Sequence, residues 1–202
     1  EGAYRTEYCN DPRGDDETVL GTDPVLTGYN VVGDVTPDEY PQNTDSPLSS
    51  QVEIEYNHCY QTPEGVLQSE PHRAKFGDFA RKLKRYITVD YAPSINAMSD
   101  YNCVLVVGMD SKNTLWVLDG WHGRCRSPVL IQRIWHYARK WATPLVGVEA
   151  VSVQDEIRQQ VADYMGAIAE RGEWTPRVVP IRYPGGVSKS DRIGGLEWRF
   201  NR

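Results

Sequence analysis

The sequence predicts a mixed α/β fold in which one five-stranded sheet is flanked by helices. Three observations lead to it. After a short helix that begins at residue 76, the elements follow the order β-β-β-α-β-α-β, the first three strands are joined by short links, and each later strand is reached through a helix. Strands with short links pair antiparallel, whereas a strand reached through a helix pairs parallel by a right-handed crossover. A length of 202 residues is within the range of one domain.

The first half of this pattern consists of a short helix and three strands. The stretch FGDFARKL predicts an amphipathic helix over 76–83. YITVDY alternates apolar and polar residues and predicts a strand over 86–91, and the more continuously apolar YNCVLVVGM predicts a central strand over 101–109. A turn at 110–113 leads to a third strand over 114–121, TLWVLDGW.

The second half alternates helices with strands. Ser127 followed by Pro128 predicts the start of a helix that runs to residue 142, where Pro144 stops it. LVGVEAV predicts a strand over 145–151, and a second helix is expected over 152–171 with Gly172 after it. RVVPIR predicts a fifth strand over 177–182, and its proline argues for the edge of the sheet. This order is the ribonuclease H-like arrangement, which alone does not determine function.

Residues 1–75 are expected to form an irregular acidic leader, and residues 76–202 the folded domain. The first 72 residues hold 15 Asp and Glu but 2 Lys and Arg, a net charge of −13, while the remainder carries +7. Turn-forming residues dominate the leader, with short extended pieces possible at 29–33 and 51–60. The overall charge of −6 argues against a polyanionic partner, whereas the second part alone favours one.

Several classes of protein are excluded by what the sequence lacks. It has no run of about 18 apolar residues and no secretion signal, so neither a membrane span nor export is expected. The four cysteines form no CxxC pair, which excludes a zinc ribbon and favours a reducing cytosolic compartment. Neither GxxxxGK[ST] nor GxSxG occurs. Because the chain opens at Glu1, it is expected to be a piece of something longer.

Two carboxylates interrupt apolar strands and are the main candidates for chemistry. Asp90 lies in the first strand of the sheet and Glu149 in the fourth, and the predicted topology makes these strands neighbours. Two carboxylates held together repel each other and favour a bound cation, for which Mg²⁺ or Mn²⁺ is suited. Two such ions could clamp both oxygens of a phosphodiester. The alternative is that each acid faces solvent on its own strand.

Other charged residues are weaker candidates. Asp100 opens the second strand and could approach the metals or serve only in a turn, whereas Asp119 is expected at the surface. Asp191 could complete a carboxylate trio or pair with Lys189 or Arg192. The basic residues Lys189, Arg192 and Arg199 near the end of the chain are candidates for DNA binding, because clustered acids need nearby cations to tolerate DNA.

Residues 86–200 contain, in order, the stretches ITVDYAPS with SDYNCVLVVGMD, LWVLDGWHGRCRSPVLIQRIWHYARKW, VGVEAV and SKSDRIGGLEWRF. Together these stretches resemble the nuclease domain of the large terminase subunit of tailed bacteriophages. The leader YRTEYCNDPRGDD is similar to the segment that joins ATPase and nuclease in that family, whereas residues 17–75 match nothing recognisable. The order and spacing of these stretches carry the resemblance more than any one of them.

The resemblance implies an endonuclease that cuts concatemeric viral DNA during genome packaging, with two divalent metal ions. Asp90 and Glu149 match catalytic acids, Asp100 matches an acid of less certain role, and Lys189 and Arg192 match a basic motif. The implied partners are double-stranded DNA, an ATPase domain of the same polypeptide, the portal and the small terminase subunit. The implied location is the host cytoplasm, transiently at the procapsid portal.

One departure leaves alternatives open. The family's third catalytic aspartate lies beyond a segment matching Arg199-Phe200, and this chain ends at Arg202, so either the chain is cut short or Asp191 substitutes. Without a third acid, weak metal binding and poor cutting are expected. The other hypotheses are a different ribonuclease H-like nuclease, such as a resolvase or transposase core, and a non-catalytic module that docks on a portal or partner.

Overall fold

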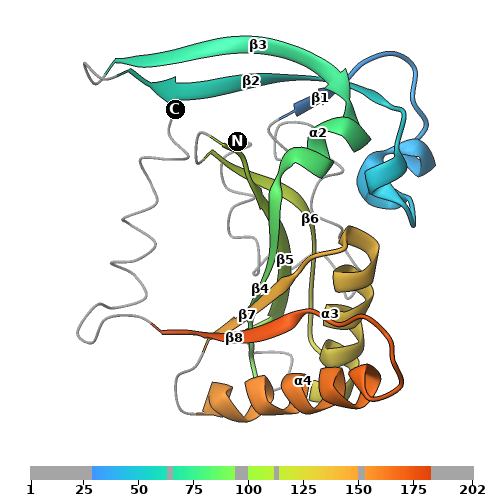
Figure 1. Ribbon diagram of the computed structural model, residues 1–202, viewed down its shortest axis with the longest axis vertical. Coiled ribbons are helices and arrows are strands. Elements are labelled where there is room, and N and C mark those ends of the chain that lie inside the picture. Colours follow the sequence, from blue (N-terminus) through green and yellow to red (C-terminus); the bar gives the residue numbers. More distant parts are fainter. Residues whose placement is uncertain (1–28, 63–65, 94–99, 112–113, 150–152, 183–202) are drawn as a thin grey trace.

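The computed structural model describes residues 29–62, 66–93, 100–111, 114–149 and 153–182, which form a mixed α/β fold with two sheets (Figure 1). The first sheet has the order β1-β2-β3 and is built from β1 (Tyr29–Val31), β2 (Glu53–Gln61) and β3 (Leu67–Lys75). The second has the order β6-β5-β4-β7-β8 and is built from β4 (Lys84–Asp90), β5 (Asn102–Met109), β6 (Leu115–Gly123), β7 (Leu145–Glu149) and β8 (Arg177–Ile181).

The second sheet has the predicted connectivity. β4, β5 and β6 pair antiparallel, and β7 pairs parallel with both β4 and β8. Every element predicted from residue 76 on is present, with bounds within two residues of those expected. β8, which contains Pro180, lies at the edge of the sheet as its proline indicated.

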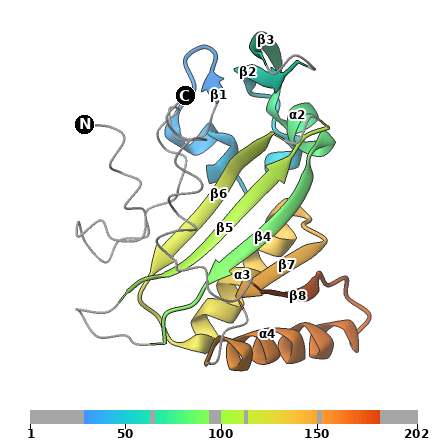
Figure 2. The same cartoon turned by 90° about the vertical axis from the view of Figure 1, so that its left-hand side faces the viewer.

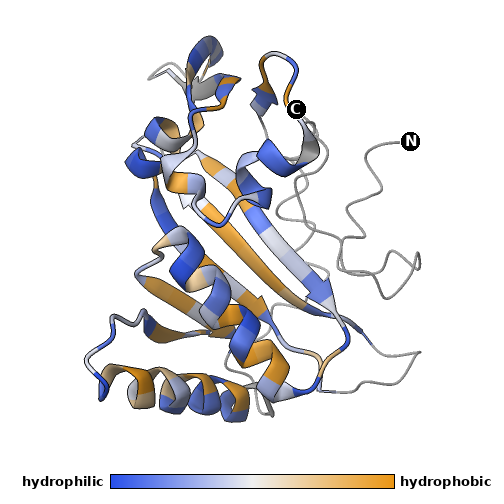
Figure 3. Ribbon diagram, turned by 90° about the vertical axis from the view of Figure 1, so that its right-hand side faces the viewer, coloured by the Kyte–Doolittle hydropathy of each residue, from blue (hydrophilic) through white to orange (hydrophobic). Residues whose placement is uncertain are grey.

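Three helices accompany the sheets: α2 (Phe76–Lys82), α3 (Ser127–Trp141) and α4 (Val153–Ala169). Both α3 and α4 have an apolar stripe and a hydrophilic stripe (Figure 3). The apolar stripes pack on the face of the second sheet that carries Ile87, Val89, Val146 and Val148, so that α3 lies behind that sheet in Figure 2. Arg126, rather than Ser127, takes the N-cap position of α3. Every helix of the described residues is too short or too polar to cross a membrane.

The expectation of an irregular leader is wrong for the described part of residues 29–75, although β1 and β2 confirm the extended pieces expected at 29–33 and 51–60. These residues form the β1-β2-β3 sheet and three short 3₁₀ helices, η2 (Pro37–Glu39), η3 (Pro41–Asn43) and η4 (Pro47–Ser49). Tyr29 and Ile54 are buried in the same core as the second sheet. β3 was not predicted, because its described residues are exposed except for Ala74 and so lack the alternation of a half-buried strand.

Aromatic rings and one close backbone approach join the two sheets. Tyr56 of β2 contacts Phe79 of α2 and Trp116 of β6, with ring centroids 4.6 and 5.4 Å apart. The amide of Gly77, near the start of α2, donates to the carbonyl of Ser50 over 3.0 Å. A Cβ at position 77 would lie 2.8 Å from that carbonyl oxygen, so only glycine fits there without a backbone shift.

A buried ionic network attaches the η3 region to the second sheet. Asp119 of β6 is fully buried, and its Oδ2 accepts hydrogen bonds from Lys140 Nζ and Trp141 Nε1, both over 2.8 Å. Lys140 Nζ also donates to the backbone carbonyl of Gln42, whose side chain accepts from the Tyr29 hydroxyl. The expectation that Asp119 lies at the surface is therefore wrong. The burial of Asp119 was missed because its hydrogen-bond partners, Lys140 and Trp141, lie on a helix 21 and 22 residues later in the sequence.

We expect Asp119→Ala to destabilise the fold by about 3–5 kcal/mol, because it leaves the Lys140 ammonium and the Trp141 indole N–H buried without their acceptor. Denaturant-induced unfolding followed by circular dichroism measures this. The matched control is Asp78→Ala, which removes an exposed carboxylate paired with Arg81 and should cost less than about 1 kcal/mol. Equal effects of the two substitutions would contradict the structural role assigned to Asp119.

Candidate functional site

The two carboxylates singled out from the sequence take adjacent positions in the second sheet. β4 and β7 are paired in parallel, with Ile87 opposite Val146 and Val89 opposite Val148. Continuing this register by one residue sets Asp90 opposite Glu149, at the carboxyl ends of both strands. Neighbouring strands lie about 5 Å apart. Two carboxylates on adjacent strands are therefore within reach of one shared cation.

Both acids project from the face of the sheet opposite α3 and α4. Side chains alternate along a strand, and Val89 and Val148, which precede the two acids, are buried under the helices. Asp90 and Glu149 thus point to the other face, where each is only partly buried. The packing confines the pair to one face but leaves it accessible, as a site for an external ligand requires.

The same face carries a row of titratable side chains across four strands. Asp90 is opposite Cys103 of β5, which in turn is opposite His122 of β6, and Glu149 lies on the other side of Asp90. Cys103 is partly buried and His122 is buried. Cys103 and His122 were not predicted as members of this row, because only the strand register aligns them with Asp90.

Buried hydrogen bonds hold the segment that follows Asp90. The side-chain oxygen of Asn102, which is fully buried, accepts from the backbone N–H of Ala92 over 3.0 Å. The amide nitrogen of Asn102 donates to the carbonyl of Cys125 over 3.2 Å. The hydroxyls of Tyr91 and Ser127 form a further bond of 3.1 Å. These contacts fix the end of β4 to the start of α3. The sequence shows Asn102 only as a polar residue within the apolar stretch 101–109, so its buried hydrogen bonds were not predicted.

The two carboxylates supply some, but not all, of the ligands that a divalent cation needs. Two adjacent carboxylates offer the hard oxygen ligands that Mg²⁺ and Mn²⁺ prefer. In the part of the chain that the structure describes, no three His, Cys, Asp or Glu side chains converge as a metal-binding group. Asp100 is exposed at the start of β5 and is not brought into such a group with the pair. Further ligands would have to be water, substrate oxygens or residues elsewhere.

Four of the predicted site residues lie outside the described residues. They are Asp191, a candidate metal ligand, and the candidate DNA-binding residues Lys189, Arg192 and Arg199.

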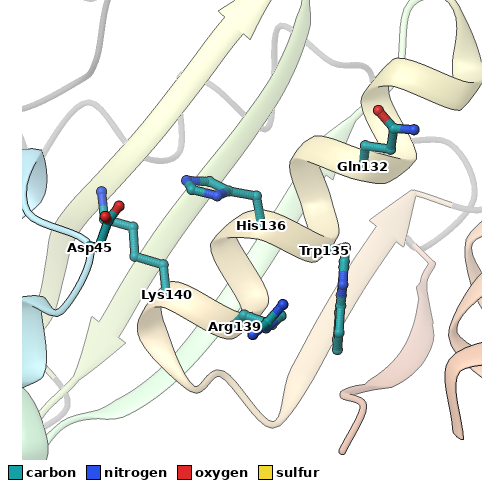
Figure 4. A pocket seen from close by; sticks show the side chains of 6 residues that line it. All are labelled: Asp45, Gln132, Trp135, His136, Arg139 and Lys140. Carbon is teal, nitrogen blue, oxygen red and sulfur yellow. The ribbon is translucent and has the colours of Figure 1, made fainter. Parts of the chain in front are cut away.

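A polar cavity of about 360 Å³ lies elsewhere, on the outer side of α3 (Figure 4). Its lining residues are Asp45, Gln132, Trp135, His136, Arg139 and Lys140. Burial, and then the charges of Lys140 and Arg133, lower the pKa of His136, while Asp119 and Asp45 act in the opposite direction. Lys140 is already engaged by Asp119. None of the predicted acids lines this cavity, so it is separate from the Asp90–Glu149 pair.

We expect Asn102→Ala to lower the free energy of unfolding by about 1–3 kcal/mol, because it leaves the Ala92 N–H and the Cys125 carbonyl without their partner. Chemical unfolding measures the change. Gln160→Ala, at an exposed position of α4, is the control and should change stability by less than about 0.5 kcal/mol. An Asn102→Ala variant as stable as this control would contradict the role given to Asn102.

Cys125 is expected to be an unreactive thiol. Burial raises its pKa to about 11, so the group stays protonated at pH 8 and becomes a thiolate only as the pH approaches that value. Alkylation by iodoacetamide at pH 8, followed by peptide mass spectrometry, should be more than about tenfold slower than for an unhindered cysteine peptide. Labelling as fast as in the peptide would rule this out, and the urea-unfolded chain serves as the positive control.

Comparisons with protein-family models, with curated proteins and with solved structures found no match to this chain. The chemistry of the site is therefore inferred from its own residues and their placement.

Proposed function

We propose that this chain is a metal-dependent DNA endonuclease domain that cuts concatemeric viral DNA during genome packaging. The observation that carries the proposal is the register of β4 and β7, which sets Asp90 beside Glu149 on an accessible face of the sheet. Two carboxylates side by side on one face of a sheet repel each other, and a bound cation relieves that repulsion.

The strand order supports the finer assignment of a ribonuclease H-like fold. Three antiparallel strands followed by two parallel ones, in the order β6-β5-β4-β7-β8, agree with the arrangement expected from the sequence. The likeness to the terminase nuclease domain adds the proposed setting. In it, an ATPase domain of the same polypeptide feeds double-stranded DNA, the portal and small subunit are partners, and the host cytoplasm is the location.

The proposed chemistry is hydrolysis of a phosphodiester by water. A divalent cation, Mg²⁺ or Mn²⁺, would supply Lewis-acid activation of water and neutralise charge on the phosphate when bound. Asp90 and Glu149 would hold it with one carboxylate each, and binding would relieve their mutual repulsion. Asn102 and the Tyr91–Ser127 bond would keep the end of β4 in place. The second ion expected for such chemistry needs more ligands, and Asp191 remains the candidate.

We expect Asp90→Asn and Glu149→Gln each to reduce Mn²⁺-dependent nicking of supercoiled plasmid at least about 100-fold, because each keeps the shape of the side chain but removes a charged ligand. The assay uses the longest natural form of the chain. Agarose-gel conversion of supercoiled to open-circular plasmid gives the rate.

The control is Asp163→Asn, an exposed acid on α4, which should cut like the unchanged chain. Nicking that persists in both Asp90→Asn and Glu149→Gln would contradict the proposal. Four-way junctions compared with linear duplexes separate it from a resolvase, for which a strong preference for junctions is expected.

A further inference from the structure

A cationic stretch of sequence lies between β6 and the end of β7, the strand that carries Glu149 at its carboxyl end. Residues 120–148 contain four arginines and one lysine but no aspartate or glutamate, in a chain of net charge −6. They cover the end of β6, all of α3 and most of β7. Lys140 is neutralised by the buried Asp119. Two of the four arginines, Arg124 and Arg126, lie between the end of β6 and the start of α3.

Arg124 lies on the same face of the sheet as Asp90. β5 and β6 are paired with Asn102 opposite Gly123 and Cys103 opposite His122. One further step sets Tyr101 opposite Arg124, and the guanidinium carbon of Arg124 lies 3.9 Å from the centre of the Tyr101 ring. By strand alternation, Tyr101 and Cys103 share a face. Cys103 is opposite Asp90, so Arg124 shares the face of the acid pair.

The separation between Arg124 and the acid pair suits neighbouring phosphates of one DNA strand. The backbone of Arg124 is two strands across and two residues along from that of Asp90, a separation of about 12 Å. The long arginine side chain spans part of this distance. Tyr101 is buried and contacts His122 through its ring edge at 5.3 Å, so the platform under the guanidinium is fixed. A guanidinium held in this way is preorganised for a phosphate.

Arg126, two residues after Arg124, contributes a second cation at the start of α3. It occupies the N-cap of α3, its side chain is exposed, and the first turn of that helix contains no acid. A cation near a helix N-terminus is disfavoured by the helix dipole. Helix stability therefore does not account for arginine at this position. The neighbouring Ser127 is bonded to Tyr91, the residue after Asp90.

We propose that Arg124 and Arg126 bind backbone phosphates of the DNA strand that is presented to Asp90 and Glu149. This inference rests on the proposed function, since it assigns the substrate contacts of the same site. Two carboxylates repel a polyanion, and that repulsion is offset for a phosphodiester by Arg124 on the same face and by Arg126 at the start of α3. An acidic protein segment would be attracted by the arginines, but the adjacent carboxylates would only repel it, whereas a phosphodiester can share a metal ion with them. Phosphate contacts of this kind do not depend on base sequence.

The test is fluorescence anisotropy of a labelled 20-base-pair duplex with the unchanged chain, Arg124→Gln, Arg126→Gln and the double variant, in Ca²⁺ and at several salt concentrations. Each lost phosphate contact should reduce the slope of log K against log salt by about 0.9, so the double variant should lose about 1.8. The control Arg73→Gln removes an exposed arginine paired with Glu55 on the β2–β3 hairpin and should change neither affinity nor slope. Thermal unfolding checks each variant. If Arg124→Gln is misfolded, the exposed Arg126→Gln alone should show a loss of about 0.9.

Three results would overturn the inference: no salt-dependent binding by the unchanged chain, a slope unaltered in the arginine variants, or displacement of the duplex by polyglutamate as readily as by unlabelled DNA. Its failure is distinguishable from that of the proposed function. If Asp90→Asn abolishes cutting while the arginine variants bind like the unchanged chain, only this inference fails. If the arginines govern binding but the unchanged chain cuts no DNA, the inference stands and the nuclease assignment fails.

Discussion

The parallel pairing of β4 with β7 is the constraint on which the candidate site depends. The pairing is dictated by the core, because Ile87 and Val89 must lie with Val146 and Val148 under α3 and α4. A shift of one residue in either strand would turn its buried valines out to the opposite face. The apolar residues that hold the register therefore also determine that the two acids end up as neighbours. Packing and chemistry occupy opposite faces of the same strands.

Polar residues that are fully buried complete the arrangement where apolar packing alone leaves the chain undefined. Asp119 links β6, α3 and the η3 region through charged and neutral donors. Burial raises the pKa of Asp119, and the donors from Lys140, Trp141 and Gly120 act against that effect. Asn102 likewise fixes the end of β4 through hydrogen bonds to the backbone of Ala92 and Cys125. Such residues fix one geometry, since any other would leave their polar atoms buried without a bond.

The sequence predicted the second sheet well because each of its strands and helices carries a strong local pattern. For residues 29–75 it indicated the extended pieces that became β1 and β2 but missed β3, whose described residues are exposed except for Ala74. It also misplaced Asp119, since a strand pattern does not reveal a lysine and a tryptophan that come later in the chain. Asp90 and Glu149 were found because a charge inside an apolar strand is a local signal. Cys103, His122 and Arg124 were missed as neighbours because only the register of the strands unites them.

The most direct test of the central claim is X-ray diffraction from crystals soaked in Mn²⁺, with anomalous data collected near the manganese absorption edge. The account predicts an anomalous peak between the carboxylates of Asp90 and Glu149, within coordination distance of an oxygen from each. A peak bound only elsewhere, or two carboxylates that diverge with no peak between them at millimolar Mn²⁺, would contradict it.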